Sequence, residues 1–167
     1  MKKILLIITS LLFYTSIVFS QSKVNINNLS DYGGKMFKEN DDKPYTGLVF
    51  DLYRTTGNKS LEGRYKDGLR NGKWSWWNED NKMDSSGTYK DGNQDGKWNW
   101  WDENGKKKDI FYKNRIEISK TVWEYFSNGQ KYSEKTFKDG RIDGLVTWWY
   151  ENGQKKSEGI NKGWENS

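Results

Sequence analysis

Aromatic rings and lysines are the residues of this chain best suited to chemistry, and the chemistry they favour is binding. The 167 residues include ten Trp, ten Tyr and seven Phe. The chain has no His and no Cys, so it lacks the commonest general base, the thiol nucleophile and the usual zinc ligands. We therefore predict no enzymatic activity, no catalytic residue and no cofactor.

One acidic phrase is similar to the start of a calcium-binding loop. Asp91-Gly-Asn93-Gln-Asp95-Gly places oxygen ligands at alternate positions, and Asp102 stands at the twelfth. That twelfth position normally carries a bidentate glutamate, and helices should flank the loop. The equivalent phrases at 67–72 and 139–144 lack a ligand at their third position. Turn chemistry explains the match, so we predict no metal site.

A period of 24 residues organises the rest of the sequence. Gly72, Gly96 and Gly144 open the phrases Gly-Lys-Trp-Ser-Trp-Trp, Gly-Lys-Trp-Asn-Trp-Trp and Gly-Leu-Val-Thr-Trp-Trp. A degenerate copy opens at Lys120. A short fixed period indicates a repeat architecture in which each unit packs only against its neighbours.

Two turn signals divide each unit. Asn-Gly pairs at 104–105, 128–129 and 152–153 suit two-residue type I′ hairpin turns. The phrases at 67–72, 91–96 and 139–144 each carry two glycines, which suit a longer turn. The runs between turns are rich in aromatic and β-branched residues, and no apolar stripe of helical period follows Gln21. We predict an all-β, elongated antiparallel meander of consecutive β-hairpins with roughly ten strands.

These phrases resemble a known family. Gly96-Lys-Trp-Asn-Trp-Trp-Asp-Glu-Asn-Gly and Trp149-Tyr-Glu-Asn-Gly-Gln-Lys-Lys-Ser-Glu-Gly are similar to the bacterial variant of the MORN repeat, over about residues 45–163. The resemblance implies a ribbon of hairpins that serves mainly in binding or scaffolding, and some members are antitoxin or immunity proteins. The fourth unit departs from the pattern, because Lys120 and Glu124 replace the usual Gly and Trp, and its second turn at 113–116 has no glycine. Asn81 also replaces the glycine of an Asn-Gly turn.

Alternation of side chains divides the rings between two faces. A turn centred on residues 104–105 would pair Trp101 with Lys108, Trp100 with Asp109 and Trp98 with Phe111. Trp74, Trp76, Trp98, Trp100 and Trp148 then share a core face. Gly87 would face Trp74, and Gly159 would face Val146, leaving room for large side chains to lie across the strand.

The opposite face carries one ring per unit among polar residues, and it is the candidate binding site. Its candidate residues are Tyr53, Trp77, Trp101, Tyr125, Trp149, Lys108 and Lys156. Asp84, Lys108, Tyr132 and Lys156 are the predicted neighbours of the last four rings. Lysine stems packing on the rings would explain this row, as would an exposed aromatic ladder that binds an extended partner.

The N-terminal residues have the pattern of a cleaved signal peptide. Lys2 and Lys3 precede an apolar run at 4–19, and Ser20 suits the cleavage position. Removing residues 1–20 lowers the formal net charge from +5 to +3, which does not favour nucleic-acid binding. We expect export to the periplasm, cell envelope or medium, a lead-in and capping segment at 21–44, the repeat array at 45–163 and a tail at 164–167.

The predicted function is binding, with another protein as the favoured partner. A glycan or a membrane surface, a toxin neutralised by an immunity-type protein, and a second copy of the chain remain the alternatives.

Overall fold

The computed structural model describes residues 23–102 and 107–162. The predicted leader at 1–20, the turn at 104–105 and the tail at 164–167 lie outside the described residues. The elements are β1 (Val24–Asn25), a 3-10 helix (Ile26–Asn28), β2 (Leu29–Tyr32), β3 (Lys35–Lys38), β4 (Gly47–Leu52), β5 (Lys59–Lys66), β6 (Leu69–Arg70), β7 (Gly72–Trp77), β8 (Met83–Lys90), β9 (Asn93–Trp101), β10 (Lys107–Lys113), β11 (Ile116–Tyr125), β12 (Lys131–Lys138), β13 (Arg141–Trp149) and β14 (Lys155–Asn161).

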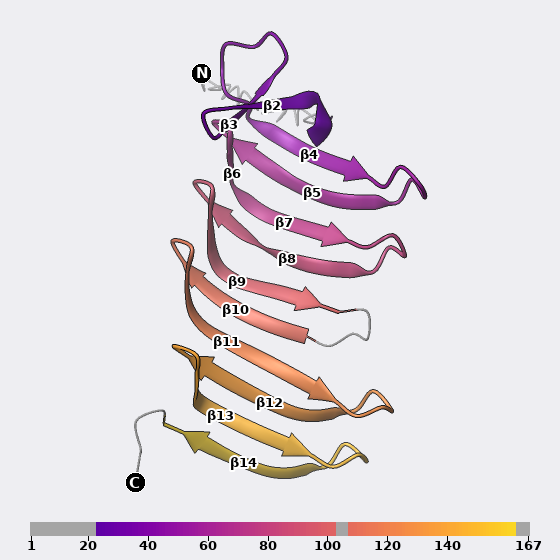
Figure 1. Ribbon diagram of the computed structural model, residues 1–167, viewed down its shortest axis with the longest axis vertical. Helices are drawn as coiled ribbons and strands as arrows, with labels where there is room; N and C mark the ends of the chain where they lie inside the picture. Colours follow the sequence, from indigo (N-terminus) through magenta and orange to yellow (C-terminus); the bar gives the residue numbers. More distant parts are fainter. Residues whose placement is uncertain (1–22, 103–106, 163–167) are drawn as a thin grey trace, which may run out of the picture.

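Twelve of these strands form one sheet in which sequence neighbours lie side by side. The order is β1-β4-β5-β7-β8-β9-β10-β11-β12-β13-β14, with β6 paired to β5. β1 pairs with β4 in parallel, and the other pairs of this sheet are antiparallel. The strands stack from the N-terminal to the C-terminal end, with hairpin loops along one margin and tight turns along the other (Figure 1). The predicted meander of hairpins is confirmed, and within the described residues no helix is long and apolar enough to cross a membrane.

The described Asn-Gly loops are not the type I′ turns that the sequence indicated. Phe126 N–H donates to Gln130 O at 2.8 Å, and Gly129 N–H donates to Phe126 O at 3.0 Å. Gly129 has a φ of 82°, whereas Asn128 does not have a positive φ. This is a three-residue loop, in which a type I turn precedes one left-handed residue. The prediction was wrong because Asn-Gly also suits this longer loop.

Type I′ geometry occurs instead at the opposite margin of the sheet. Asp91 and Gly92 have φ values of 49° and 81°, and the flanking residues Lys90 and Asn93 pair directly. Two positive φ values in a two-residue loop define this turn. The longer turn predicted for 91–96 is therefore wrong. Gly96 lies within β9, with a φ of 71°.

An extra residue beside the hairpin loops shifts the pairing of the return strand by one position. Trp77 pairs with Met83, which makes Asp84 a bulged residue. The same irregularity leaves Tyr132 and Lys156 out of the pairing of their hairpins. A bulge of this kind places two residues opposite one. Asp84, Tyr132 and Lys156 are therefore not the cross-strand partners that we predicted.

The hairpin of β9 and β10 is shifted along its whole length. The observed pairs are Trp101 with Lys107, Trp100 with Lys108 and Trp98 with Ile110. The symmetric turn at 104–105 predicted partners one residue later, so these three predicted pairs are wrong. In the observed register five residues separate Trp101 from Lys107, whereas the predicted pairing of Trp101 with Lys108 leaves six.

Tryptophan rings cover the backbone of the preceding strand on the core face. Trp74 and Trp98 are 0% and 3% exposed. A Cβ added to Gly63 would overlap the indole of Trp74, and one added to Gly87 would overlap that of Trp98. Burial of one such ring contributes roughly 4–6 kcal/mol before entropy costs. Each ring also donates its indole N–H to the carbonyl of the residue after the glycine, Arg64 at 3.1 Å for Trp74 and Thr88 at 3.0 Å for Trp98.

The pairing of the glycines was predicted correctly, but the ring that covers Gly87 was not. Gly87 pairs with Trp74, and Gly159 pairs with Val146. The space above Gly87 is filled by Trp98, which comes from the next strand. Each ring therefore reaches back over the hairpin before it.

Charged residues replace the ring stack further along the core face. Ring centroids lie 5.6 Å apart for Trp98 and Trp100, and the Lys108 ammonium lies 5.4 Å from the Trp100 centroid. Glu124 stands one period after Trp100 and pairs with Lys135 at 2.7 Å. It also accepts a hydrogen bond from the fully buried Ser133 hydroxyl. The stack therefore gives way to a polar network after β10.

A small hairpin lies against the N-terminal end of the array. β2 and β3 form a separate two-stranded sheet. Met36 N–H donates to Gly68 O at 3.0 Å, and Tyr45 N–H donates to Met36 O at 2.7 Å. Leu29 joins Tyr45 in a buried cluster with Val49, Tyr65 and Trp74. These contacts attach the small hairpin to the first repeat units.

The ladder face as candidate functional site

The face opposite the core carries one partly buried ring at the end of the first strand of each hairpin. We call it the ladder face. Its predicted residues are Tyr53, Trp77, Trp101, Tyr125 and Trp149, all partly buried. Four of them end their strands, and Tyr53 directly follows β4. The Tyr53 hydroxyl donates to Trp77 O at 2.7 Å, which ties the first two hairpins together.

Lysine ammonium groups lie between successive rings of this face. Lys107 Nζ is 5.8 Å from the centroid of Trp101 and 5.2 Å from that of Trp123. Lys131 Nζ is 5.7 Å from the centroid of Trp123 and 5.3 Å from that of Trp149. A cation over an indole is attracted by its ring electrons, by about 0.5–1 kcal/mol at an exposed site. Tryptophan rings and lysine cations therefore alternate along the ladder face from Trp101 to Trp149.

Trp123 is a ladder-face ring that the sequence analysis missed. It stands one period after Asn99 and one before Thr147, at a position that is polar in those units. Alternation along the strand places it on the same face as Tyr125, and this signal could have identified it. Trp123 Nε1 donates to Glu134 at 2.7 Å, so the ring is held in a defined orientation.

The two lysines predicted for this site lie elsewhere. Lys108 lies over Trp100 on the core face. Lys156 is the bulged residue of its hairpin and lies 5.5 Å from the ring centroid of Tyr150. The cations of the ladder face come instead from Lys107 and Lys131. Each lies one residue before the position that the predicted register gave, which was Lys108 or Tyr132.

A buried carboxylate supports the central lysine. Asp109 is 1% exposed and lies between Lys97, at 2.5 Å, and Lys107, at 3.5 Å. Its Oδ1 is within ion-pair distance of Lys107 but has no hydrogen-bond partner of good geometry among the described residues. A buried charge without a partner is costly, so Asp109 favours a position of the Lys107 ammonium close to it.

The return strands repeat a Lys-x-x-Glu ion pair. The pairs are Lys59 with Glu62 at 2.8 Å, Lys131 with Glu134 at 3.2 Å and Lys155 with Glu158 at 2.5 Å. The hydrogen bond from Lys59 lowers the pKa of Glu62, although burial acts in the opposite direction. The ladder lysines therefore have acidic partners as well as rings.

Tyr125 occupies an acidic part of the same face. Burial raises the pKa of its phenol, and the negative charges of Glu134, Asp109 and Asp102 raise it further. The phenol therefore stays neutral near neutral pH and is available to donate or accept a hydrogen bond.

A hollow lies beside the small N-terminal hairpin. It has a volume of about 780 Å³ and is lined by Tyr65, Arg70, Tyr89 and Arg115, among others. The Arg70 guanidinium lies 4.7 Å from the Trp74 centroid and donates to the Tyr89 hydroxyl at 3.0 Å. Burial alone would lower the pKa of Arg70, but hydrogen bonds to Tyr65 and Tyr89 raise it above its usual value. Arg70 is therefore part of the aromatic packing.

The ladder face offers rings, cations and paired carboxylates, which suit recognition of another molecule. Within residues 23–102 and 107–162, no group of three or more acidic or other metal-ligating side chains is placed to hold a metal ion. The expected absence of catalysis and of a metal stays a prediction.

Comparison with known proteins identifies the repeats. Residues 70–91, 94–114 and 142–160 match the family model described as MORN repeat variant. No curated protein matches the chain. A solved structure described as "Crystal structure of GtfA/B complex bound to UDP and GlcNAc" is 10% identical, with a TM-score of 0.25 over 85% of this chain and 27% of that one. That score is too low to support an argument.

The three matched segments coincide with hairpins of the sheet. They overlap β7 and β8, then β9 and β10, then β13 and β14. MORN repeats are generally binding or scaffold modules. The repeated match, in step with the hairpins, shows that this chain carries repeats of the MORN repeat variant family.

Proposed function

We propose that this protein is a non-enzymatic scaffold that binds another protein through its ladder face. The binding role of MORN repeats supports this proposal, and so does the absence of His and Cys from the sequence. The partner we favour presents acidic side chains beside apolar ones, because these would complement the cations and rings of the face.

The observation that carries the proposal is the position of Lys107 between Trp101 and Trp123. An ammonium held between two rings presents a positive charge and two apolar surfaces at one place. Lys131 repeats this arrangement one period later, between Trp123 and Trp149. Two such positions, one period apart, suit an extended partner surface. Aromatic residues at the centre of an interface commonly contribute most of the binding energy.

Replacement of two neighbouring rings tests this proposal. The double variant Trp101→Ser, Trp123→Ser should lose partner capture in pull-downs from the native cell envelope, measured by quantitative mass spectrometry. Truncation of a central interface ring costs about 2 kcal/mol or more, so two truncations should reduce capture strongly. The melting temperature should fall by only a few degrees, because both rings are partly exposed.

Tyr32→Ser is the matched control. Tyr32 is 67% exposed and belongs to the small N-terminal hairpin, so its loss should leave capture unchanged. Undiminished capture by a folded double variant would remove the ladder face as the binding site. Specific retention on a glycan array or on vesicles, without a protein partner, would favour a cell-surface module instead. Neutralisation of a toxin would identify the immunity-type alternative.

We also propose that the protein acts outside the cytoplasm. The charged and apolar pattern of residues 1–20 supports this compartment. Cell fractionation and the mass of the mature chain test the location, and retention of residues 1–20 in a cytoplasmic protein would exclude it.

A further inference from the structure

The outer edge of β14 is open among the described residues. β14 pairs with β13 on one side, and it ends the strand order of the sheet. All seven of its residues are exposed. The edge strand of a sheet presents unpaired backbone N–H and C=O groups to an incoming strand.

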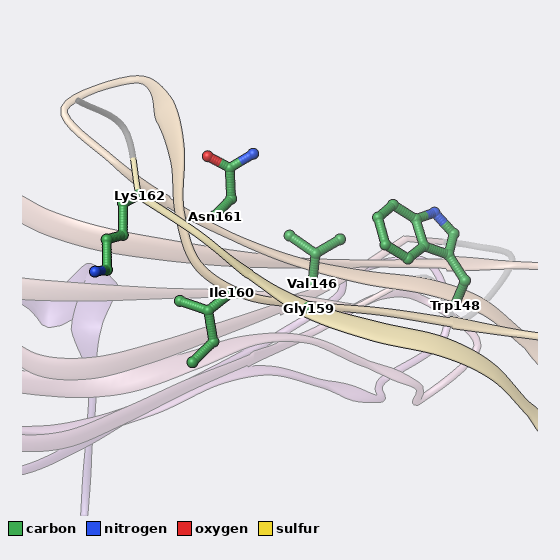
Figure 2. Close-up of a pocket in the computed structure, with 6 residues that line it drawn as sticks. All are labelled: Val146, Trp148, Gly159, Ile160, Asn161 and Lys162. Atoms are coloured by element: carbon green, nitrogen blue, oxygen red, sulfur yellow. The ribbon is translucent and has the colours of Figure 1, made fainter. Parts of the chain in front are cut away.

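A hollow of about 340 Å³ lies at this edge, around Gly159. Val146, Trp148 and Asn161 point to one side of the strands, whereas Ile160 and Lys162 point to the other (Figure 2). A Cβ added to Gly159 would meet no described atom within 4 Å. Gly159 stands three periods after Gly87, whose equivalent space is filled by an indole.

The other repeat units show what belongs above such a glycine. Trp74 lies over Gly63, and Trp98 lies over Gly87, each from the next strand of the sheet. The positions equivalent to these rings in later units are Val122, which pairs with Lys108, and Val146, which pairs with Lys135. This chain therefore combines glycine with a tryptophan on the next strand, and lysine with a valine. Position 159 is a glycine, which is the residue that this chain combines with a tryptophan on the next strand.

We propose that the free edge of β14 binds an extended peptide strand of another protein, with a tryptophan seated over Gly159. The strand runs antiparallel to β14, as β9 runs antiparallel to β8. Its indole N–H donates to the Ile160 carbonyl, because Trp74 and Trp98 each donate to the residue after their glycine. Val146 and Trp148 form the apolar wall of the site.

Charge selects an acidic strand for this edge. Residues 155–162 contain three lysines and one glutamate, a net charge of +2, and the glutamate is paired with Lys155. Two such edges repel each other, and lysine is a common means of preventing self-pairing of edge strands. The occupant is therefore an acidic strand of a different protein rather than β14 of a second copy. This site is separate from the ladder rings and does not depend on their function.

A labelled peptide tests the proposal on the full mature chain. The probe is a fluorescein-labelled nine-residue peptide with the sequence Glu-Thr-Glu-Val-Trp-Val-Glu-Thr-Glu, and binding is followed by fluorescence anisotropy. The same peptide with alanine in place of tryptophan should bind at least about thirtyfold more weakly. Gly159→Val should cause a similar loss, because its side chain would occupy the place of the indole. Residue 159 does not have a left-handed φ, so valine adds no backbone strain there.

Two protein variants serve as controls. Ser119→Val adds a branched side chain to β11, and it should bind the peptide like the unchanged chain. The Trp101→Ser, Trp123→Ser variant should also bind it normally, which separates this site from the ladder face. Equal binding of the tryptophan and alanine peptides would overturn the proposal, and so would full binding to Gly159→Val.

Two further results would assign the edge to a different occupant and so overturn the proposal. The first is self-association of the chain in sedimentation, abolished by Gly159→Val, which would indicate a second copy. The second is peptide binding that occurs only in a Trp164→Ala variant, which would indicate competition from the chain's own residues.

Discussion

The pairing of a glycine with a tryptophan on the next strand is the residue-scale feature that most clearly distinguishes the repeat units. Gly63 and Gly87 lie under indole rings, whereas the space beside Gly159 is open. The same residue type therefore has a packing role at two positions and no described contact at the third.

Alanine at these positions should have opposite effects on stability. Gly87→Ala should lower the free energy of unfolding by about 2–3 kcal/mol, because the new methyl group and the ring of Trp98 cannot share the space. Gly159→Ala should be neutral or stabilise by up to about 1 kcal/mol, because it restricts the unfolded chain without a clash. Urea unfolding followed by circular dichroism measures both values. Equal losses of unfolding free energy would contradict the packing of Trp98 over Gly87.

At the scale of the element, the hairpins were predictable but their connections were not. A 24-residue period, with alternating faces between turn signals, is local information, and it gave the all-β meander correctly. Asn-Gly and Asp-Gly suit more than one loop length. The type I′ turn was therefore predicted for the Asn-Gly loops and the longer turn for the Asp-Gly loops, whereas the structure has the reverse. One bulged residue moves the cross-strand partner by one position, and the residue types in the sequence do not show where a bulge occurs.

The prediction of the candidate site was limited in the same way, because it depended on the cross-strand register. The rings of the ladder were placed by alternation, which survives a bulge near the loop. Their lysine neighbours were assigned from register, so Lys108 and Lys156 were chosen instead of Lys107 and Lys131. Trp123 was missed because its position is polar in the other units, although its own strand places it beside Tyr125.

The turn between β10 and β11 offers a test at this scale. Asn114 and Arg115 have φ values of 51° and 70°, so an arginine adopts the left-handed geometry that glycine has in the equivalent turns. A non-glycine residue in this region costs roughly 1–2 kcal/mol. Arg115→Gly should therefore stabilise the protein by about 1 kcal/mol in urea unfolding. The reverse change, Gly140→Arg, should destabilise it by a similar amount, and no difference between the two variants would contradict this account.

At the scale of the molecule, the two halves of the array are held together differently. The stack from Trp74 to Trp100 gives β5 to β9 a continuous apolar core. Glu124 and Lys135 interrupt that core further along, and β14 is exposed throughout. Repeat units interact only with their neighbours, so local stability can differ along the array.

Hydrogen exchange should resolve this difference. Backbone amides of β12 and β13 that are bonded within the sheet should exchange faster than those of β7 and β8, because fewer rings shield them. Native-state exchange read by mass spectrometry measures the two groups in one experiment. Uniform protection across the array would show that the sheet opens as a single cooperative unit.

Trp74 and Trp98 each pack over a glycine of the preceding strand, so the packing has a direction along the chain. Trp98 needs the backbone around Gly87 to be in place already, whereas the strand that contains Gly87 does not need Trp98 to form its own hairpin. The chain is synthesised in this same order, from its N-terminal end onward. The hairpins that carry Trp74 and Trp98 can therefore dock on strands that are already formed, without waiting for the last residues of the array.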